Sequence, residues 1–174
     1  MPHSLLVDRL LFDRIESPIG TILLASDGEA LCALDFDDCE DRMNALMRKR
    51  YGDFSLRPAA DPKGFSARLR EYFNGDFAAL ENVPVSTGGT AFQQQVWGAL
   101  RTIPRGSTQS YHQIAEKIGK PNASRAVGFA NSLNPIAIAI PCHRVIGANS
   151  ALTGYAGGLH RKQWLLAHEG ATHR

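Results

Sequence analysis

Short apolar runs separated by turn residues open the chain, and a helical spacing of apolar positions follows them. Three of these runs predict strands, at residues 10–16, 21–25 and 30–37. Asp27-Gly28 lies between the second and third runs and is typical of a hairpin turn. Residues 41–51 and 65–73 carry apolar side chains three or four positions apart, so each stretch predicts an amphipathic helix. The first half of the chain therefore predicts strands followed by helices.

Helical spacing continues through the second half. Thr90 is the expected N-cap of a helix whose apolar stripe comprises Phe92, Val96, Ala99, Leu100 and Ile103. Ser110 is the expected N-cap of a second helix at 111–118, and a third helix is expected at 123–132 after the turn 119–122. Two helices joined by a glycine-containing turn predict a helix-turn-helix, whose second helix would lie on DNA. Helix pairs that do not bind DNA share the same pattern.

The charge changes sign between the two halves. Residues 1–90 contain ten Lys or Arg and fifteen Asp or Glu, a net charge of −5, whereas residues 91–174 contain nine and two, a net charge of +7. We place a domain boundary in the stretch 82–89, which contains Pro and Gly, and this gives domains at 1–89 and 90–174. A basic second domain suggests a polyanionic partner for that domain alone, although the same charge would also keep a domain in solution.

Composition excludes several classes of protein. The chain has 174 residues, 44% of them hydrophobic, and no apolar run of about 18 residues that could span a membrane. Charged side chains interrupt residues 1–15, so this stretch does not resemble a signal peptide. Three cysteines without dense spacing favour a reducing cytoplasm over a disulfide framework. Cys32 is expected in the core, and neither Cys32 nor Cys39 has neighbours spaced like zinc ligands, so we expect no metal and no cofactor.

The apolar stretch 136–140 ends in Pro141, Cys142 and His143. The nucleophilic form of cysteine is the thiolate, and burial without a compensating group raises the pKa of a thiol. Cys142 is therefore either an inert core residue or a nucleophile with its own base, and His143 would be that base.

Small residues dominate the third helix of the second half, at 123–130. Arg125 is the side chain there that reaches far enough to contact base edges in a major groove. Small side chains instead let the backbone approach a surface closely, which suits the narrow minor groove and predicts little sequence preference. The same residues would also suit tight packing between helices.

Several motifs together resemble the O6-alkylguanine-DNA alkyltransferases, also called methylated-DNA–protein-cysteine methyltransferases, and in particular the short bacterial constitutive type. The resemblance covers residues 91–170 without a gap and is looser in the first half, where it rests on 17–20 and 69–73. The motifs of the second half are Pro141-Cys142-His143-Arg144-Val145, Ser110-Tyr111, Ser124-Arg125-Ala126-Val127-Gly128, Asn134-Pro135, residues 153–158 and residues 164–170.

This resemblance implies an α+β N-terminal domain with a small antiparallel sheet, and a mostly helical, winged-helix-like C-terminal domain with the helix-turn-helix. It implies direct-reversal DNA repair without a cofactor. The alkyl group of O6-alkylguanine, with O4-alkylthymine as a second candidate substrate, moves irreversibly and once to Cys142 after the nucleotide flips out from the minor groove. The implied partner is double-stranded DNA containing alkylated guanine, bound by a cytoplasmic monomer, and the division of charge would allow cooperative assembly on DNA.

The resemblance also implies roles for catalytic residues. Cys142 accepts the alkyl group, His143 removes the thiol proton through a bound water, and Glu169 holds and polarises His143. Tyr111 donates to the base ring and pushes on the phosphate that rotates. Asn134 orders the turn before the active-site segment.

Further residues are implied in binding. The backbone N–H of Ala156 faces the leaving oxygen, although many family members carry Ser at this position. The carbonyls of Cys142 and Val145 accept from the exocyclic amine of guanine, and Tyr155 and Gly157 line the pocket. Arg125 fills the gap in the base stack. The other residues implied at the DNA surface are Ala123, Ser124, Ala126, Gly128 and Tyr111.

Two other functions stay open on the sequence. A non-enzymatic DNA binder would be either a damage sensor, which lacks the acceptor cysteine that this chain has, or a regulator with a sequence preference. A Cys-His hydrolase would need an oxyanion hole and an acyl substrate, and a basic helix of small residues has no use in such an enzyme.

Overall fold

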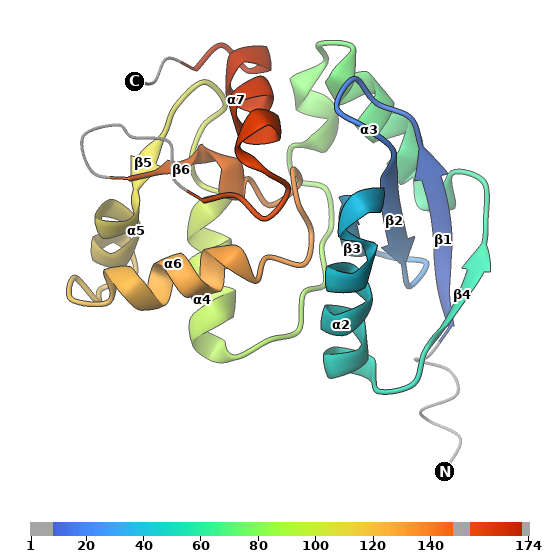
Figure 1. Cartoon of the computed structure of the whole chain (residues 1–174), viewed down its shortest axis with the longest axis horizontal. Helices are drawn as coiled ribbons and strands as arrows, with labels where there is room; N and C mark the ends of the chain where they lie inside the picture. Colours follow the sequence, from blue (N-terminus) through green and yellow to red (C-terminus); the bar gives the residue numbers. More distant parts are fainter. Residues whose placement is uncertain (1–8, 148–153, 172–174) are drawn as a thin grey trace. The chain divides into compact units, whose positions relative to one another are not determined.

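The computed structural model describes residues 9–147 and 154–171, and the chain divides into two compact units, Met1–Gly88 and Gly89–Arg174. The first unit combines a small sheet with helices, and the second is mostly helical (Figure 1). This arrangement confirms the predicted fold class. Among the described residues, no helix is long and apolar enough to cross a membrane. The signal-peptide prediction concerns residues 1–15, of which 1–8 lie outside the described part.

The sheet of the first unit has four strands in the order β3-β2-β1-β4. The predicted strands are observed as β1 (Arg9–Ile15), β2 (Ile22–Ser26) and β3 (Leu31–Phe36), which pair antiparallel. β4 (Ser55–Pro58) pairs parallel to β1, so the sheet is mixed rather than wholly antiparallel. Leu56 is the one strongly apolar residue of β4, and its Pro58 is tolerated because the strand lies at an edge, so the sequence carries little signal for it.

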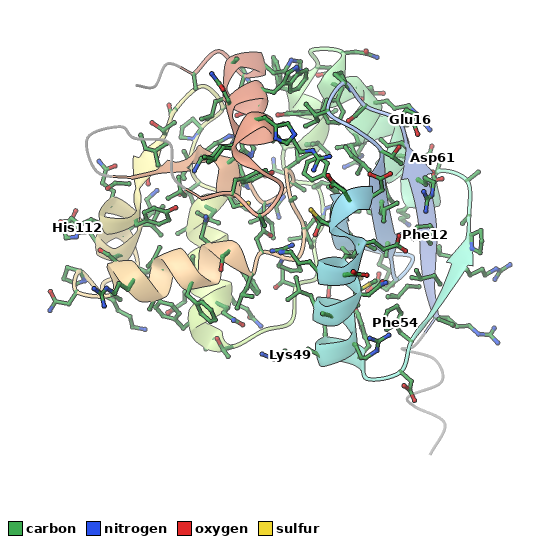
Figure 2. The ribbon with its side chains drawn as sticks, in the orientation of Figure 1. Phe12, Glu16, Lys49, Phe54, Asp61 and His112 are labelled. Carbon is green, nitrogen blue, oxygen red and sulfur yellow. The ribbon has the colours of Figure 1, made fainter. Side chains whose placement is uncertain are left out.

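Helices α2 (Glu40–Tyr51) and α3 (Phe65–Phe73) are the two amphipathic helices that the spacing predicts. Met43 and Met47 of α2 join a buried cluster with Leu10, Leu23, Ala25, Cys32 and Ala33 of the sheet. Phe12 and Phe54, labelled in Figure 2, pack against this cluster and are themselves partly buried. Cys32 is a core residue, as expected. Short 3-10 helices cover Asp37–Cys39 (η1), Pro62–Gly64 (η2) and Phe77–Leu80 (η3).

The helices described in the second unit are α4 (Ala91–Leu100), α5 (Tyr111–Lys117), α6 (Ser124–Ser132) and α7 (Leu159–His168). Thr90 and Ser110 cap α4 and α5 as predicted, each within a capping box. The Thr90 hydroxyl accepts from the backbone N–H of Gln93 at 3.1 Å, and the Gln93 carboxamide accepts from the backbone N–H of Thr90 at 3.0 Å. Ser110 and Gln113 make the same pair of bonds at 3.1 and 2.8 Å. Both helix starts are therefore fixed by local sequence.

α5 and α6 form the predicted helix-turn-helix and both pack against α4 (Figure 1). The indole Nε1–H of Trp97 on α4 donates to the carbonyl of Ala130 on α6 at 2.9 Å. The side of α6 that carries Val127 and Ala130 is buried, and the opposite side is exposed. His112 on α5 points outward, away from α4 (Figure 2). The packing thus fixes which side of α6 a partner can reach.

A two-stranded sheet ties the helix-turn-helix to the segment around Cys142. β5 (Gln109–Ser110) directly precedes α5 and pairs parallel with β6 (Val145–Ile146). The 3-10 turn η4 (Cys142–Arg144) directly precedes β6. The pairing therefore holds the first residue of α5, Tyr111, in the neighbourhood of Cys142.

Asn134 holds the loop that leads into Cys142. Its Oδ1 accepts from the backbone N–H of Ile136 at 2.9 Å, and its Nδ2 donates to the carbonyl of Ile140 at 2.8 Å. The five residues from 136 to 140 are buried, as the apolar pattern predicts. Ile138 adopts a φ of 70°, which is strained for a β-branched residue. The strain is tolerated because the loop is fixed at both ends.

Candidate active site

Cys142 opens onto a cavity of about 280 Å³ in the second unit. The side chain is only 6% exposed, at the start of η4, where its backbone N–H donates to the carbonyl of Ile140 at 2.7 Å. The residues that share the cavity with Cys142 are Tyr111, Gly128, Asn131, Ser132, Gly154, Tyr155 and Ala156. This volume lies just below the range of about 300–1,000 Å³ typical of small-ligand pockets, so a single nucleobase is a ligand of suitable size.

The cavity brings together some of the predicted site residues and not others. Tyr111, Gly128, Tyr155 and Ala156 line it with Cys142. Val145 and Gly157 are buried beside it without lining it. Of the residues predicted at the DNA surface, Arg125 and Ala126 are exposed on α6, and Ala123, Ser124 and Gly128 are half-buried. Thr153, the first residue of the 153–158 motif, lies outside the described residues.

His143 and Glu169 form a buried pair next to Cys142 in the chain. His143 is completely buried and Glu169 is 1% exposed, and His143 Nε2 lies 2.9 Å from Glu169 Oε2. Burial lowers the pKa of His143, and the neighbouring carboxylate offsets only part of this effect. A neutral imidazole that donates its Nε2–H to Glu169 carries its lone pair on Nδ1. Nδ1 has no hydrogen-bond partner among the described residues, so it is the basic atom of the pair.

Arg144 keeps the Glu169 carboxylate ionised. Its Nε and Nη2 donate to Oε1 and Oε2 of Glu169, both at 2.9 Å, and its Nη1 donates to the carbonyl of Ile103 at 2.8 Å. Burial alone would raise the pKa of Glu169, but the hydrogen bonds from His143 and Arg144 and the positive charge of Arg144 hold this pKa well below its usual value. Glu169 can therefore act as a fixed anion that orients His143.

Lys162 supplies a second cation beside the partly buried Arg144. It is completely buried on α7, and its Nζ donates to the carbonyl of Val145 at 2.5 Å. Burial lowers the pKa of Lys162 to about 8, and the charge of Cys142 opposes that shift. Because the two groups interact electrostatically, the ammonium favours the thiolate of Cys142. We call His143, Arg144, Lys162 and Glu169 the buried charge network.

Three of the residues gathered here are absent from the site that the sequence predicts. Arg144 and Lys162 complete the buried charge network, and Asn131 lines the cavity with an Oδ1 that has no hydrogen-bond partner among the described residues. Lys162 leaves a signal in the sequence, because it lies three and four positions before Leu165 and Leu166, on the apolar side of its helix. Asn131 leaves a similar signal, four positions after the buried Val127.

Among the described residues, no three His, Cys, Asp or Glu side chains lie close enough together to hold a metal ion.

Two family models match the chain. Residues 91–171 match the DNA binding domain of 6-O-methylguanine DNA methyltransferase, and residues 10–87 match its ribonuclease-like domain. Together these matches cover nearly all of the described chain.

Individual relatives agree with the family models. A methylated-DNA–protein-cysteine methyltransferase of Shigella flexneri is 47% identical over 165 residues, which are 93% of this chain and 96% of that protein. The crystal structure of Mycobacterium tuberculosis O6-methylguanine methyltransferase has a TM-score of 0.76 at 43% identity and covers 92% of this chain and 93% of its own. A Mycobacterium tuberculosis relative in complex with DNA has a TM-score of 0.78 at 44% identity, over 93% and 92% of the two chains. The chain therefore belongs to the O6-methylguanine-DNA methyltransferase family, the methylated-DNA–protein-cysteine methyltransferases.

Proposed function

We propose that this chain repairs O6-alkylguanine in double-stranded DNA by moving the alkyl group to the sulfur of Cys142, once per molecule. The observation that carries the proposal is the position of Cys142, on a base-sized cavity and directly before a buried His-Glu-Arg arrangement. A soft sulfur nucleophile and a desolvated base are what displacement at an alkyl carbon requires.

The transfer is a single displacement. The thiol proton of Cys142 passes through a water to Nδ1 of His143, and Glu169 stabilises the imidazolium that forms. The sulfur–carbon bond forms as the bond between carbon and the guanine O6 breaks, and the electron pair of that bond stays on the oxygen. The backbone N–H of Ala156 and the hydroxyl of Tyr111 stabilise the negative charge that develops on the base. The product is a thioether, and no described group of the site could return it to a thiol, so we infer one turnover.

The reacting base must leave the duplex to reach the sulfur. Cys142 is 6% exposed at the wall of a cavity, which a base held in a stack cannot enter. Arg125, exposed on α6, fills the space that the nucleotide leaves. The small residues Ala126 and Gly128 let the helix approach the minor groove closely. O4-alkylthymine is a second candidate substrate for the same displacement.

Guanine recognition relies on main-chain acceptors. The carbonyls of Cys142 and Val145 accept from the exocyclic amine of the extruded guanine. The carbonyl of Val145 already accepts from Lys162, which leaves its second lone pair for the base. We further propose that the chain acts as a cytoplasmic monomer on DNA.

Intact-mass measurement tests this proposal. The chain is incubated with an excess of duplex that carries O6-methylguanine, and one methyl group is expected on the peptide that contains Cys142. Cys142→Ser should abolish transfer and leave duplex binding intact. Cys39→Ser, a change at a half-buried thiol of the first unit, should keep the full stoichiometry. A methyl group on another residue, or more than one group per chain, would contradict the mechanism.

A further inference from the structure

An exposed aromatic side chain interrupts the small-residue surface of α6. Phe129 is 66% exposed, the largest exposure recorded for a large hydrophobic side chain in residues 9–147 and 154–171. Exposed positions on α6 fall at Arg125, Ala126, Phe129 and Ser132, a spacing that places them on one side of the helix. We call these four residues the exposed face of α6. A face of small residues would let the helix backbone approach DNA evenly, and Phe129 prevents this.

The position of Phe129 relates it to the cavity. Gly128, Asn131 and Ser132 of the same helix line the cavity that holds Cys142, and Phe129 follows Gly128 directly without lining it. Ser132 belongs both to the exposed face of α6 and to the cavity lining, so the sugar and phosphates of a nucleotide whose base enters the cavity would pass beside this face. Phe129 therefore lies where the flanking nucleotides pass, one helical turn after Arg125.

The chemistry of the Phe129 ring indicates which groups of a nucleic acid it can contact. A phenyl group cannot pair with phosphates, and it gains free energy when apolar surface leaves water. The walls of a minor groove offer deoxyribose carbons, and proteins that widen this groove insert apolar side chains between base steps. Residues 91–174 carry a net charge of +7. Because DNA is a polyanion, this charge favours duplex DNA as the partner of the exposed face of α6.

Resting on the proposed function, we propose that Phe129 is an apolar wedge that enters the minor groove beside the extruded nucleotide. Arg125 and Phe129 then contact the duplex at two neighbouring places. Arg125 fills the gap left by the flipped base, and Phe129 holds the neighbouring step open by contact with its sugars or bases. This contact adds affinity without neutralising a phosphate.

Binding of a duplex that carries O6-methylguanine tests the wedge. The Phe129 variants are measured at several salt concentrations in a Cys142→Ser background, so that no alkyl group is transferred during the measurement. Phe129→Ala should weaken binding about 5- to 30-fold, with Phe129→Leu in between, because the apolar area that is buried decreases in this order. The dependence of log affinity on log salt should keep the wild-type slope, because that slope counts neutralised phosphates. Leu159→Ala, which truncates an apolar side chain 48% exposed at the start of α7, should leave affinity unchanged.

The reaction with free O6-benzylguanine separates this proposal from the proposed function. Phe129→Ala should react with the free base at the wild-type rate, because Phe129 does not line the cavity. Unchanged or tighter duplex binding by Phe129→Ala would overturn the wedge, as would a shallower salt slope, an equal loss in Leu159→Ala, or a slower reaction with the free base. If instead the wild-type chain transferred no benzyl group to Cys142, the proposed function would fail, whatever the variants bind.

Discussion

The buried charge network and the exposed face of α6 belong to the same unit and are built in opposite ways. Glu169 accepts hydrogen bonds from Arg144 and pairs with His143. Glu169 and His143 are each at most 1% exposed. The exposed face of α6 has one long cation, Arg125, surrounded by small or apolar residues. The ion pair of Glu169 is kept out of water, whereas the surface that we propose to meet DNA stays open. The same substitution, Arg to Ala, should therefore have different consequences in the two regions.

Arg144→Ala should produce the largest loss of stability. It leaves the Glu169 carboxylate buried without its bidentate partner, and breaking such a pair costs about 3–5 kcal/mol. Urea denaturation would measure the loss in the free energy of unfolding. Arg125→Ala is the matched control, because truncation of an exposed side chain usually changes stability by less than about 0.5 kcal/mol. Equal losses of stability in Arg144→Ala and Arg125→Ala would contradict the distinction between the buried charge network and the exposed face of α6.

Lys162→Met should stabilise the chain below pH 8, and this gain should shrink as the pH rises. The folded pKa of about 8 lies below the value of about 10.4 for a free lysine. The unfolded chain therefore binds more protons between these two values, and the free energy of unfolding of the wild type rises with pH in that window, by at most about 3 kcal/mol. Below pH 8 the buried charge carries its full cost, so Lys162→Met should be the more stable protein there.

Urea titrations from pH 7 to pH 10 would show the gap between the two proteins closing as pH rises. Alkyl transfer by Lys162→Met should be slower at every pH below 8, because the thiolate loses a neighbouring cation. Lys117→Met, at an exposed position on α5, is the control and should show no such pH dependence. A constant gap would mean that Lys162 is not the group that titrates.

Arg125→Ala should act on repair rather than on stability. Extruding a nucleotide costs a few kcal/mol, and loss of the group that fills the gap should slow duplex repair about tenfold. The reaction with free O6-benzylguanine involves no extrusion and should keep its rate. Single-turnover rates with the two substrates measure the difference. A similar slowing with both would place Arg125 in the chemistry of Cys142 and not at the DNA surface.

Ser110→Ala should give the smallest effect. It removes the hydroxyl that accepts from Gln113 at the start of α5, which costs about 1 kcal/mol. Thr90→Ala removes the equivalent bond at α4 and should cost a similar amount. Urea denaturation of the two variants measures the loss in the free energy of unfolding that each substitution causes. A cost at Ser110 near that of Arg144→Ala would show that the helix-turn-helix depends on its cap as strongly as the site depends on its ion pair.

Local signals explain most of what the sequence could predict. Thr90 and Ser110 lie three residues before Gln93 and Gln113, so both capping boxes can be read directly from the chain. The chain neighbours Cys142 and His143 mark the site in the same way. Arg144 and Glu169 are 25 residues apart, so their bidentate contact exists only once α7 has packed against η4. β4 carries little local signal for a related reason, because its place in the sheet depends on β1 and not on its own residues.

The loop clamp made by Asn134 has a consequence for variation along the chain. Both of its hydrogen bonds go to backbone atoms, the N–H of residue 136 and the carbonyl of residue 140. The position of the sulfur is thus set without reference to the side chains in between. Apolar residues from 136 to 140 can be exchanged for others of similar volume while the nucleophile stays in register, and a change at Asn134 alone would release it.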